Sequence, residues 1–180
     1  MKLLLFKPTI FTDERGLFLE SFHKERYEKK GILAHFVQDN ISHSKKNVIR
    51  GLHYQLPFAQ GKLVYVSHGS AFDVVVDIRR GSPTFGKNFS FILDDMERQQ
   101  LYIPPGFAHG FCALSDEVDF VYKCTDYYHP ETEKGILWND PALKIQWPIT
   151  HPLLSPKDNA FPLLKNIPLE DLPLFEDLQK

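Results

Sequence analysis

The chain has 180 residues, enough for one domain with its own hydrophobic core, and 13% of them are aromatic. Its 21 Lys and Arg residues nearly cancel its 23 Asp and Glu residues, which leaves a formal net charge of −2. This balance gives no general attraction to a nucleic-acid polymer or to an anionic membrane. No apolar stretch approaches the ~20 residues that a membrane-spanning helix needs, so we expect no membrane partner.

The N-terminal segment predicts a first strand followed by one short helix. Its apolar run breaks at a Lys-Pro pair and lacks a small-residue cleavage site, unlike a signal peptide. Cys112 and Cys124 have no paired spacing, so a reduced, cytoplasmic setting is expected. Residues 23–30 are rich in charged helix formers and stop at Gly31, which predicts a surface helix.

Short strands dominate the pattern from residue 35 onward. Apolar residues alternate with more polar ones through residues 72–79, which predicts a half-buried strand. Similar runs, separated by Gly, Pro and Asp turns, lie at residues 63–66, 89–93, 101–103, 111–114 and 119–124. Many short strands at close spacing predict an all-β sandwich or jelly roll.

The last third of the chain has a different composition. Eight of the 13 prolines lie from Pro130 onward. Because proline removes a backbone donor and blocks helix interiors, we expect mostly extended loop there, with a helical turn or two at residues 169–178. From about residue 148 this loop should wrap the same core. No linker is evident, so residues 1–180 are predicted to form a single domain.

Two histidine motifs are candidates for chemistry. His53 lies in a strand-forming run at residues 50–55, and His109 follows a rigid Pro-Gly turn at residues 104–106. Either histidine alone is typical of a core or surface position. Together the motifs resemble those of cupin jelly rolls, whose second motif has the spacing PxGxxH. A cupin metal site needs a second imidazole in the first motif and a later Glu, so no metal is expected here.

The chain contains no phosphate loop, GxGxxG or GxSxG motif. This excludes nucleotide hydrolysis by a P-loop, Rossmann redox chemistry and the α/β-hydrolase route. A metal-dependent cupin, such as a dioxygenase, and a non-catalytic cupin that binds sugar nucleotides stay open as alternatives.

A longer series of motifs, all in one order, extends over about residues 8–165. They lie at residues 13–16, 38–40, 50–55, 60–62, 72–79, 81–86, 104–111 and 154–158. This combination resembles the dTDP-4-dehydrorhamnose 3,5-epimerase family. The resemblance implies a cupin-type double-stranded β-helix with a few short peripheral helices. It also implies a cofactor-independent conversion of dTDP-4-dehydro-6-deoxy-D-glucose to dTDP-4-dehydro-L-rhamnose, in dTDP-L-rhamnose biosynthesis for cell-envelope polysaccharides such as lipopolysaccharide.

Such a reaction needs a base, an acid and a stabiliser of negative charge. The C3 and C5 protons flank the C4 ketone, so removal of either proton gives an enolate. By the resemblance, His53 is the base and Asp158 is the carboxylate that pairs with it. Tyr122 matches the acid of the family, and Lys62 matches the lysine near the C4 oxygen.

The resemblance also implies a substrate-binding set and a homodimer. Arg15, Arg50 and Lys157 resemble groups that hold the diphosphate, and Tyr128 matches the aromatic that stacks on thymine. In the family the N-terminal region contributes to the partner's site, so Arg15 is expected to act across the interface. Glu20 is likewise expected to act across the interface. Further substrate contacts are implied for Glu20, Gln38, Asp39, Asn40, Lys62, His109 and Glu133.

Departures from the family pattern leave the identity of the sugar substrate undecided. They occur at Phe58, Tyr65, Asn88 and Phe161, so the detailed shape of the pocket is not fixed by the resemblance. An epimerase that acts on C3 alone, or on another nucleotide-linked 4-keto sugar such as a GDP-linked heptose, remains an alternative.

Overall fold

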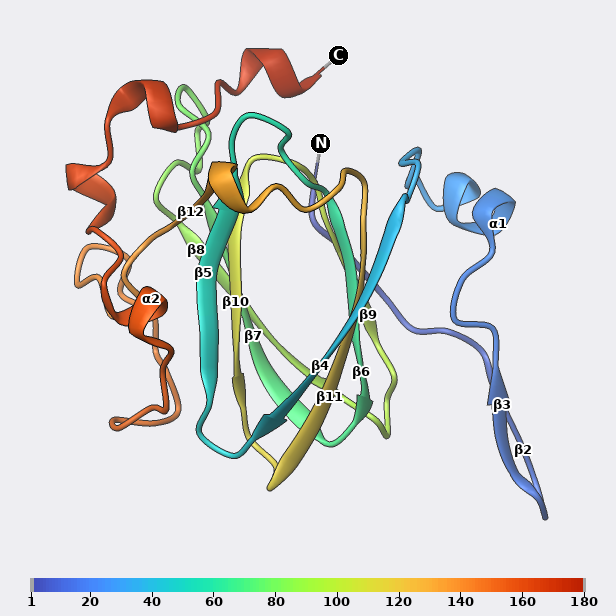
Figure 1. The fold of residues 1–180 in the computed structure, drawn as a ribbon. Helices are drawn as coiled ribbons and strands as arrows, with labels where there is room; N and C mark the ends of the chain where they lie inside the picture. The colour runs from blue at the N-terminus through green and yellow to red at the C-terminus, as the bar shows by residue number, and fades with distance from the viewer. Residues whose placement is uncertain (1, 180) are drawn as a thin grey trace.

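The computed structural model describes residues 2–179, and two five-stranded antiparallel sheets face each other across its centre (Figure 1). The first sheet has the order β1 (Leu4–Phe6), β9 (Gln100–Ile103), β6 (Lys62–His68), β11 (Glu117–Cys124) and β4 (Gln38–Lys45). The second has the order β12 (Glu133–Gly135), β5 (Ile49–Gln55), β10 (Phe107–Ala113), β7 (Ser70–Asp77) and β8 (Asn88–Asp94). The predicted all-β jelly roll is therefore confirmed.

The remaining elements lie around the two sheets. The predicted surface helix is α1 (Lys24–Lys29), and a hairpin of β2 (Ile10–Asp13) and β3 (Gly16–Leu19) projects away from the body (Figure 1). The C-terminal third contains α2 (Pro156–Asn159) and the short 3-10 turns η1 (Pro130–Thr132), η2 (Leu164–Asn166), η3 (Leu169–Asp171) and η4 (Glu176–Gln179). No helix within residues 2–179 has the length and apolar character needed to cross a membrane.

The main core fills the space between the sheets. Val64 and Val66 of β6 face Val75 of β7 there, and all three are fully buried. Phe111 and Phe120 stack across the gap with ring centroids 4.1 Å apart. Alternation along each strand points these side chains into the gap between the sheets. At one end of this gap, several of the inward-pointing residues are polar.

A second apolar layer covers the outer face of β7. The sequence pattern predicted a half-buried strand there, and that prediction is wrong, because every residue from Asp73 to Asp77 is buried. Val74 and Val76 pack against Leu164 and Leu172 of the C-terminal segment. A strand covered by a distant part of the chain has two buried faces, a property that its own alternation does not report.

Candidate active site

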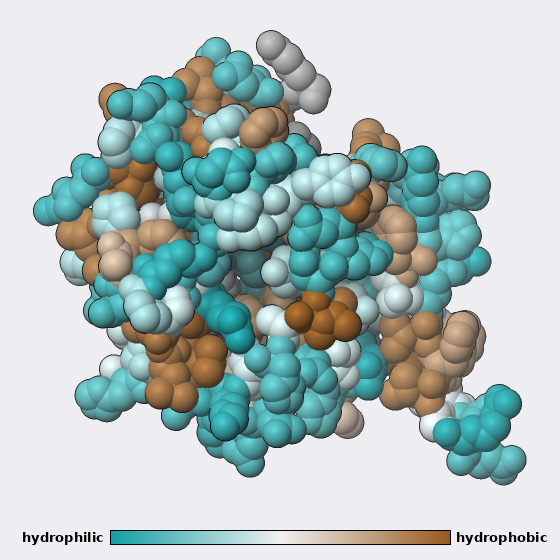
Figure 2. All heavy atoms as spheres, viewed as in Figure 1, coloured by the Kyte–Doolittle hydropathy of each residue, from teal (hydrophilic) through white to brown (hydrophobic). Residues whose placement is uncertain are grey.

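A cavity of about 720 Å³ opens between the two sheets. In the view of Figure 2, a recess lies near the middle of the face, with hydrophilic residues around most of its rim. Strands from both sheets and helix α2 supply the lining. Eleven of the candidate residues line it: Gln38, Asn40, Arg50, His53, Lys62, His109, Tyr122, Tyr128, Glu133, Lys157 and Asp158.

A close approach of two strands brings His53 opposite His109. The two histidines are register partners on β5 and β10, and the register shifts directly after them. A Cβ atom added to Gly51 would lie 2.5 Å from the Cα atom of Gly110, so the backbones touch at a point that tolerates no side chain. Glycine at both positions therefore permits the approach that brings both imidazoles to the cavity.

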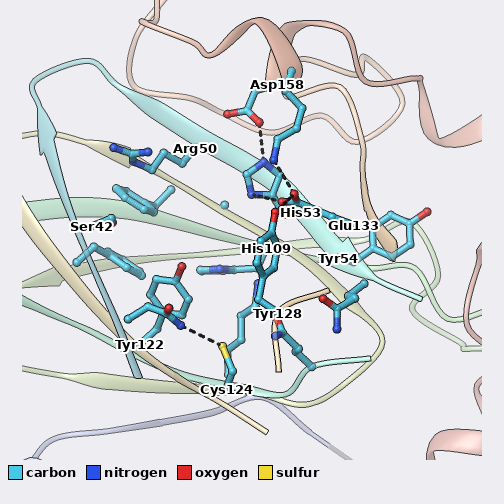
Figure 3. A pocket seen from close by; sticks show the side chains of 18 of the residues that line it. Ser42, Arg50, His53, Tyr54, His109, Tyr122, Cys124, Tyr128, Glu133 and Asp158 are labelled. Carbon is cyan, nitrogen blue, oxygen red and sulfur yellow. Dashed lines mark hydrogen bonds and ion pairs between the residues drawn. The ribbon is translucent and has the colours of Figure 1, made fainter. Parts of the chain in front are cut away.

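His53 makes its closest contact with Asp158 of helix α2. His53 Nε2 lies 2.6 Å from Asp158 Oδ1, as drawn in Figure 3, and the side chain of Asp158 is only 4% exposed. Burial by itself would raise the pKa of Asp158, but the hydrogen bond and the positive charge of His53 lower it below its usual value. Ser155 caps the helix by accepting a hydrogen bond from the Asp158 backbone N–H at 3.1 Å.

Glu133 contacts three of the other candidate residues. Its Oε2 atom accepts hydrogen bonds from Tyr128 Oη at 2.7 Å and from Lys157 Nζ at 2.6 Å. Its Oε1 atom lies 3.8 Å from His53 Nδ1, the ring nitrogen that Asp158 does not bind. Burial favours a raised pKa for Glu133, but the hydrogen bonds from Lys157 and Tyr128 outweigh it and lower the pKa.

His109 has a carboxylate partner that sequence reasoning missed. His109 Nε2 lies 2.7 Å from Asp73 Oδ2, and both residues are buried. The alternation pattern had placed Asp73 among the polar residues of its strand. A charged residue inside the otherwise apolar stretch 71–76 was the available signal, because a buried carboxylate requires a partner.

Tyr122 and Lys62 extend from the sheet opposite His53 (Figure 3 labels His53 and Tyr122). Burial raises the pKa of the Tyr122 hydroxyl, so the phenol holds its proton more firmly than in water. Burial lowers the pKa of Lys62, although the neighbouring acidic groups Cys124, Glu133 and Asp73 oppose this. A protonated phenol and the amine of the half-buried Lys62 thus face the imidazole of His53 across the cavity.

Three candidate residues lie outside the cavity of the single chain. Arg15, in the β2–β3 hairpin, donates hydrogen bonds to Asp13. Glu20 accepts two from Arg26 at 3.1 Å. Asp39 pairs with Lys123 at 2.9 Å on the outer face of β4, because alternation turns it away from its neighbours Gln38 and Asn40.

Within the described part of the chain, the site contains no cluster of metal ligands, and two residues that depart from the family pattern pack on histidines at or near it. Among residues 2–179, no group of three or more His, Cys, Asp or Glu side chains is arranged to hold a metal ion. Phe161, one of the departures from the family pattern, packs against His53 in a T-shaped arrangement with ring centroids 5.6 Å apart. Phe58, another departure, stacks on His129 at 4.3 Å.

Comparison with known proteins identifies the family. A family model described as dTDP-4-dehydrorhamnose 3,5-epimerase matches residues 1–166. The chain is 55% identical over 157 residues to the dTDP-4-dehydrorhamnose 3,5-epimerase of Shigella flexneri, covering 86% of this chain and 87% of the relative. It is 57% identical to the enzyme of that name from Neisseria gonorrhoeae, covering 87% of this chain but 48% of that longer protein, so the chain spans about half its length.

A solved structure extends the likeness to three dimensions. It is the dTDP-6-deoxy-D-glucose-3,5-epimerase of Legionella pneumophila in complex with dTDP-4-keto-L-rhamnose. The TM-score is 0.94 at 55% sequence identity, and the match covers 96% of this chain and 93% of the Legionella chain. The fold, the ordered motifs and these matches agree, and the chain belongs to the dTDP-4-dehydrorhamnose 3,5-epimerase family.

Proposed function

We propose that the cavity around His53 is the active site of this dTDP-4-dehydrorhamnose 3,5-epimerase, in dTDP-rhamnose biosynthesis. Its substrate is dTDP-4-dehydro-6-deoxy-D-glucose, and its product is dTDP-4-dehydro-L-rhamnose. The observation that carries the assignment is the His53–Asp158 pair, which faces Tyr122 from the opposite sheet. A base and an acid on opposite sides of a sugar ring are what inversion at a carbon requires.

His53 removes the protons, and Asp158 prepares it for this role. The carboxylate accepts a hydrogen bond from Nε2, which fixes the tautomer and leaves the Nδ1 lone pair free. When Nδ1 takes a proton from C3 or C5, the negative charge of Asp158 stabilises the imidazolium that forms. His109, held by Asp73, lines the cavity beside His53 and supplies a further polar contact to the sugar.

Tyr122 donates a proton to the enolate, and Lys62 stabilises its negative charge. The raised pKa of the Tyr122 phenol keeps it protonated at neutral pH, so it can donate to the enolate carbon from the face opposite His53. Lys62 places an amine in the cavity, where its ammonium form stabilises the negative charge on the C4 oxygen. Both protons are acidified by the same ketone, so one acid–base set serves both carbons, provided that His53 gives its proton to solvent and Tyr122 regains one from solvent between the two inversions.

The remaining lining residues bind the nucleotide. Arg50 and Lys157 offer positive charge to the diphosphate, and Tyr128 offers a half-exposed ring on which thymine stacks. The hydrogen bond from Gln38 to Asn40 at 2.9 Å orients both amides toward the nucleotide or sugar. The Legionella relative, whose structure contains dTDP-4-keto-L-rhamnose, supports a ligand of this class.

A second copy of the chain supplies Arg15 and Glu20 in this proposal. The β2–β3 hairpin, which carries Arg15, projects from the body (Figure 1). Phe11 and Phe18 of this hairpin are exposed, and Ile41 on the edge strand β4 is 73% exposed. An apolar edge of this kind is suited to pairing between copies. Mixing inactive Arg15→Ala with inactive His53→Ala should restore activity through mixed dimers. Full activity of Arg15→Ala alone, or no recovery on mixing, would refute the shared site.

Solvent exchange tests the reaction itself. In deuterated water with dTDP-4-dehydro-6-deoxy-D-glucose, the wild-type chain should place deuterium at C3 and C5 of the product, as read by NMR. Exchange at C3 alone would replace the double epimerisation with a single one. If neither carbon exchanges with this or any other nucleotide-linked 4-keto sugar, the proposed function is wrong.

A further inference from the structure

Glu133 lies between His53 and the more exposed Lys157 at the cavity. On the short strand β12, Glu133 pairs with Gln55 and Gly135 pairs with His53, so the side chains of Glu133 and His53 lie on the same face of neighbouring strands. The Glu133 side chain is 14% exposed, whereas that of its partner Lys157 is 51% exposed. Figure 3 shows Glu133 beside both His53 and Tyr128. One carboxylate therefore contacts both the inner part of the site, at His53, and the outer part, at Lys157 and Tyr128.

The Oε2 atom holds the outer part. It accepts hydrogen bonds from Lys157 and Tyr128, which are the groups assigned above to the diphosphate and to thymine. The same contact raises the pKa of Tyr128 to about 12, because the ionised carboxylate opposes a phenolate. A diphosphate brings negative charge to Lys157, so it must compete with Glu133 for the ammonium.

The Oε1 atom faces the inner part. It lies 3.8 Å from His53 Nδ1, the nitrogen that receives the substrate proton. A carboxylate at this distance favours the charged imidazolium. While Lys157 is bound to Glu133, its positive charge offsets that effect. Once a diphosphate holds Lys157, the full negative charge of Glu133 acts on His53.

We propose that Glu133 is a positioning residue that couples binding of the nucleotide diphosphate at Lys157 to proton removal by His53. In the empty site Glu133 holds Lys157 and Tyr128, and in the occupied site its charge supports the protonated base. The coupling rests on the proposed function, in which His53 is the base and Lys157 binds the diphosphate. It predicts that loss of the Glu133 charge improves nucleotide binding and impairs catalysis, a combination that neither a simple binding residue nor a structural residue would give.

The test compares Glu133→Gln with the wild-type chain in two assays. Calorimetry with dTDP, which needs no turnover, should show binding about two- to fivefold tighter in the variant, the range that loss of a partly exposed competing ion pair supplies. With the 4-keto sugar nucleotide, kcat should fall about 10-fold or more, and KM should not rise. Glu133→Ala provides the same comparison if the amide variant does not fold.

Two controls separate the coupling from a general change of charge. Glu131→Gln removes a charge from the preceding turn, where Glu131 pairs with His129, and leaves the hydrogen bonds of Lys157 and Tyr128 to Glu133 in place, so dTDP affinity and kcat should stay close to wild type. In a Lys157→Met background, Glu133→Gln should no longer tighten dTDP binding, because the competing ion pair is already absent.

Three results would overturn the coupling. Weaker dTDP binding by Glu133→Gln would make Glu133 a direct nucleotide contact. Tighter binding with unchanged kcat would show that its charge does not act on His53. Unchanged values in both assays would leave Glu133 without either role. Each of these requires a wild-type chain that binds dTDP and turns over, so they are distinguishable from failure of the proposed function.

Discussion

His53 Nε2 and Asp158 Oδ1 lie 2.6 Å apart although the two residues are 105 positions apart in the chain. The contact forms because the C-terminal segment packs along the outer face of the second sheet and carries α2 to the edge of the cavity. The nearly complete burial of Asp158 makes the contact strong, since little water competes for the carboxylate. The base of the reaction therefore depends on a segment that supplies little of the sheet.

Replacing Asp158 by Asn should impair catalysis without unfolding the chain. The amide keeps the shape of the side chain but loses its charge, and its NH2 group can donate to Nε2 and stabilise the wrong tautomer of His53. We expect kcat to fall about 10²–10⁴-fold, by the same logic as in serine-protease triads. Steady-state kinetics and a thermal melt measure the two effects. Exposed Asp177→Asn is the matched control, and a wild-type kcat in Asp158→Asn would show that His53 works without its partner.

Replacing Tyr122 by Phe should separate proton removal from inversion. His53 remains able to take a proton, so deuterium should still enter C3 and C5 of the recovered substrate in deuterated water. Inversion needs a donor on the other face, so product formation should fall about 10²–10⁴-fold. NMR of substrate and product measures both. Loss of substrate exchange together with turnover would mean that Tyr122 acts before the enolate forms.

Lys62 should set a limit on activity at high pH. Burial lowers the pKa of this amine from its usual 10.5, so it loses its charge at a lower pH than an exposed lysine. The reaction needs the ammonium form, and kcat should therefore fall as pH rises through that lowered value. Lys62→Met should have a low kcat without this alkaline limb. An unchanged limb in the variant would assign the titration to another group.

Residue patterns predicted part of this site and missed part of it for physical reasons. The alternating strands and the turn before His109 are local features, and they were predicted near their observed positions. Asp73 was missed because a period-two pattern reports which face a residue is on, not what covers that face. The distance from His53 to Asp158 depends on tertiary packing, and the position of Arg15 outside the cavity of one chain does too. Neither position has a signal in the local sequence pattern.

The buried pair of Asp77 and Arg79 should govern stability at acid pH. Asp77 is fully buried and accepts hydrogen bonds from Arg79 at 2.9 and 2.8 Å and from the hydroxyls of Ser82 and Thr84 at 2.6 Å. Burial alone would raise the pKa of Asp77, but these donors lower it overall. Asp77→Asn removes the charge and leaves the buried guanidinium of Arg79 without its carboxylate, so the free energy of unfolding should fall by about 3–5 kcal/mol at neutral pH.

The sign of the pH dependence follows from that lowered pKa. A carboxylate that ionises more readily in the folded than in the unfolded chain stabilises the fold fully above its unfolded value of about 3.9. The stabilisation is lost as pH falls through the lower folded value. The difference between wild type and Asp77→Asn in urea unfolding should therefore be constant near neutrality and shrink in acid. Because Asp158 and Glu133 are present in both chains, their titrations cancel in this difference, and a gap that persists undiminished in acid would contradict the role of Asp77.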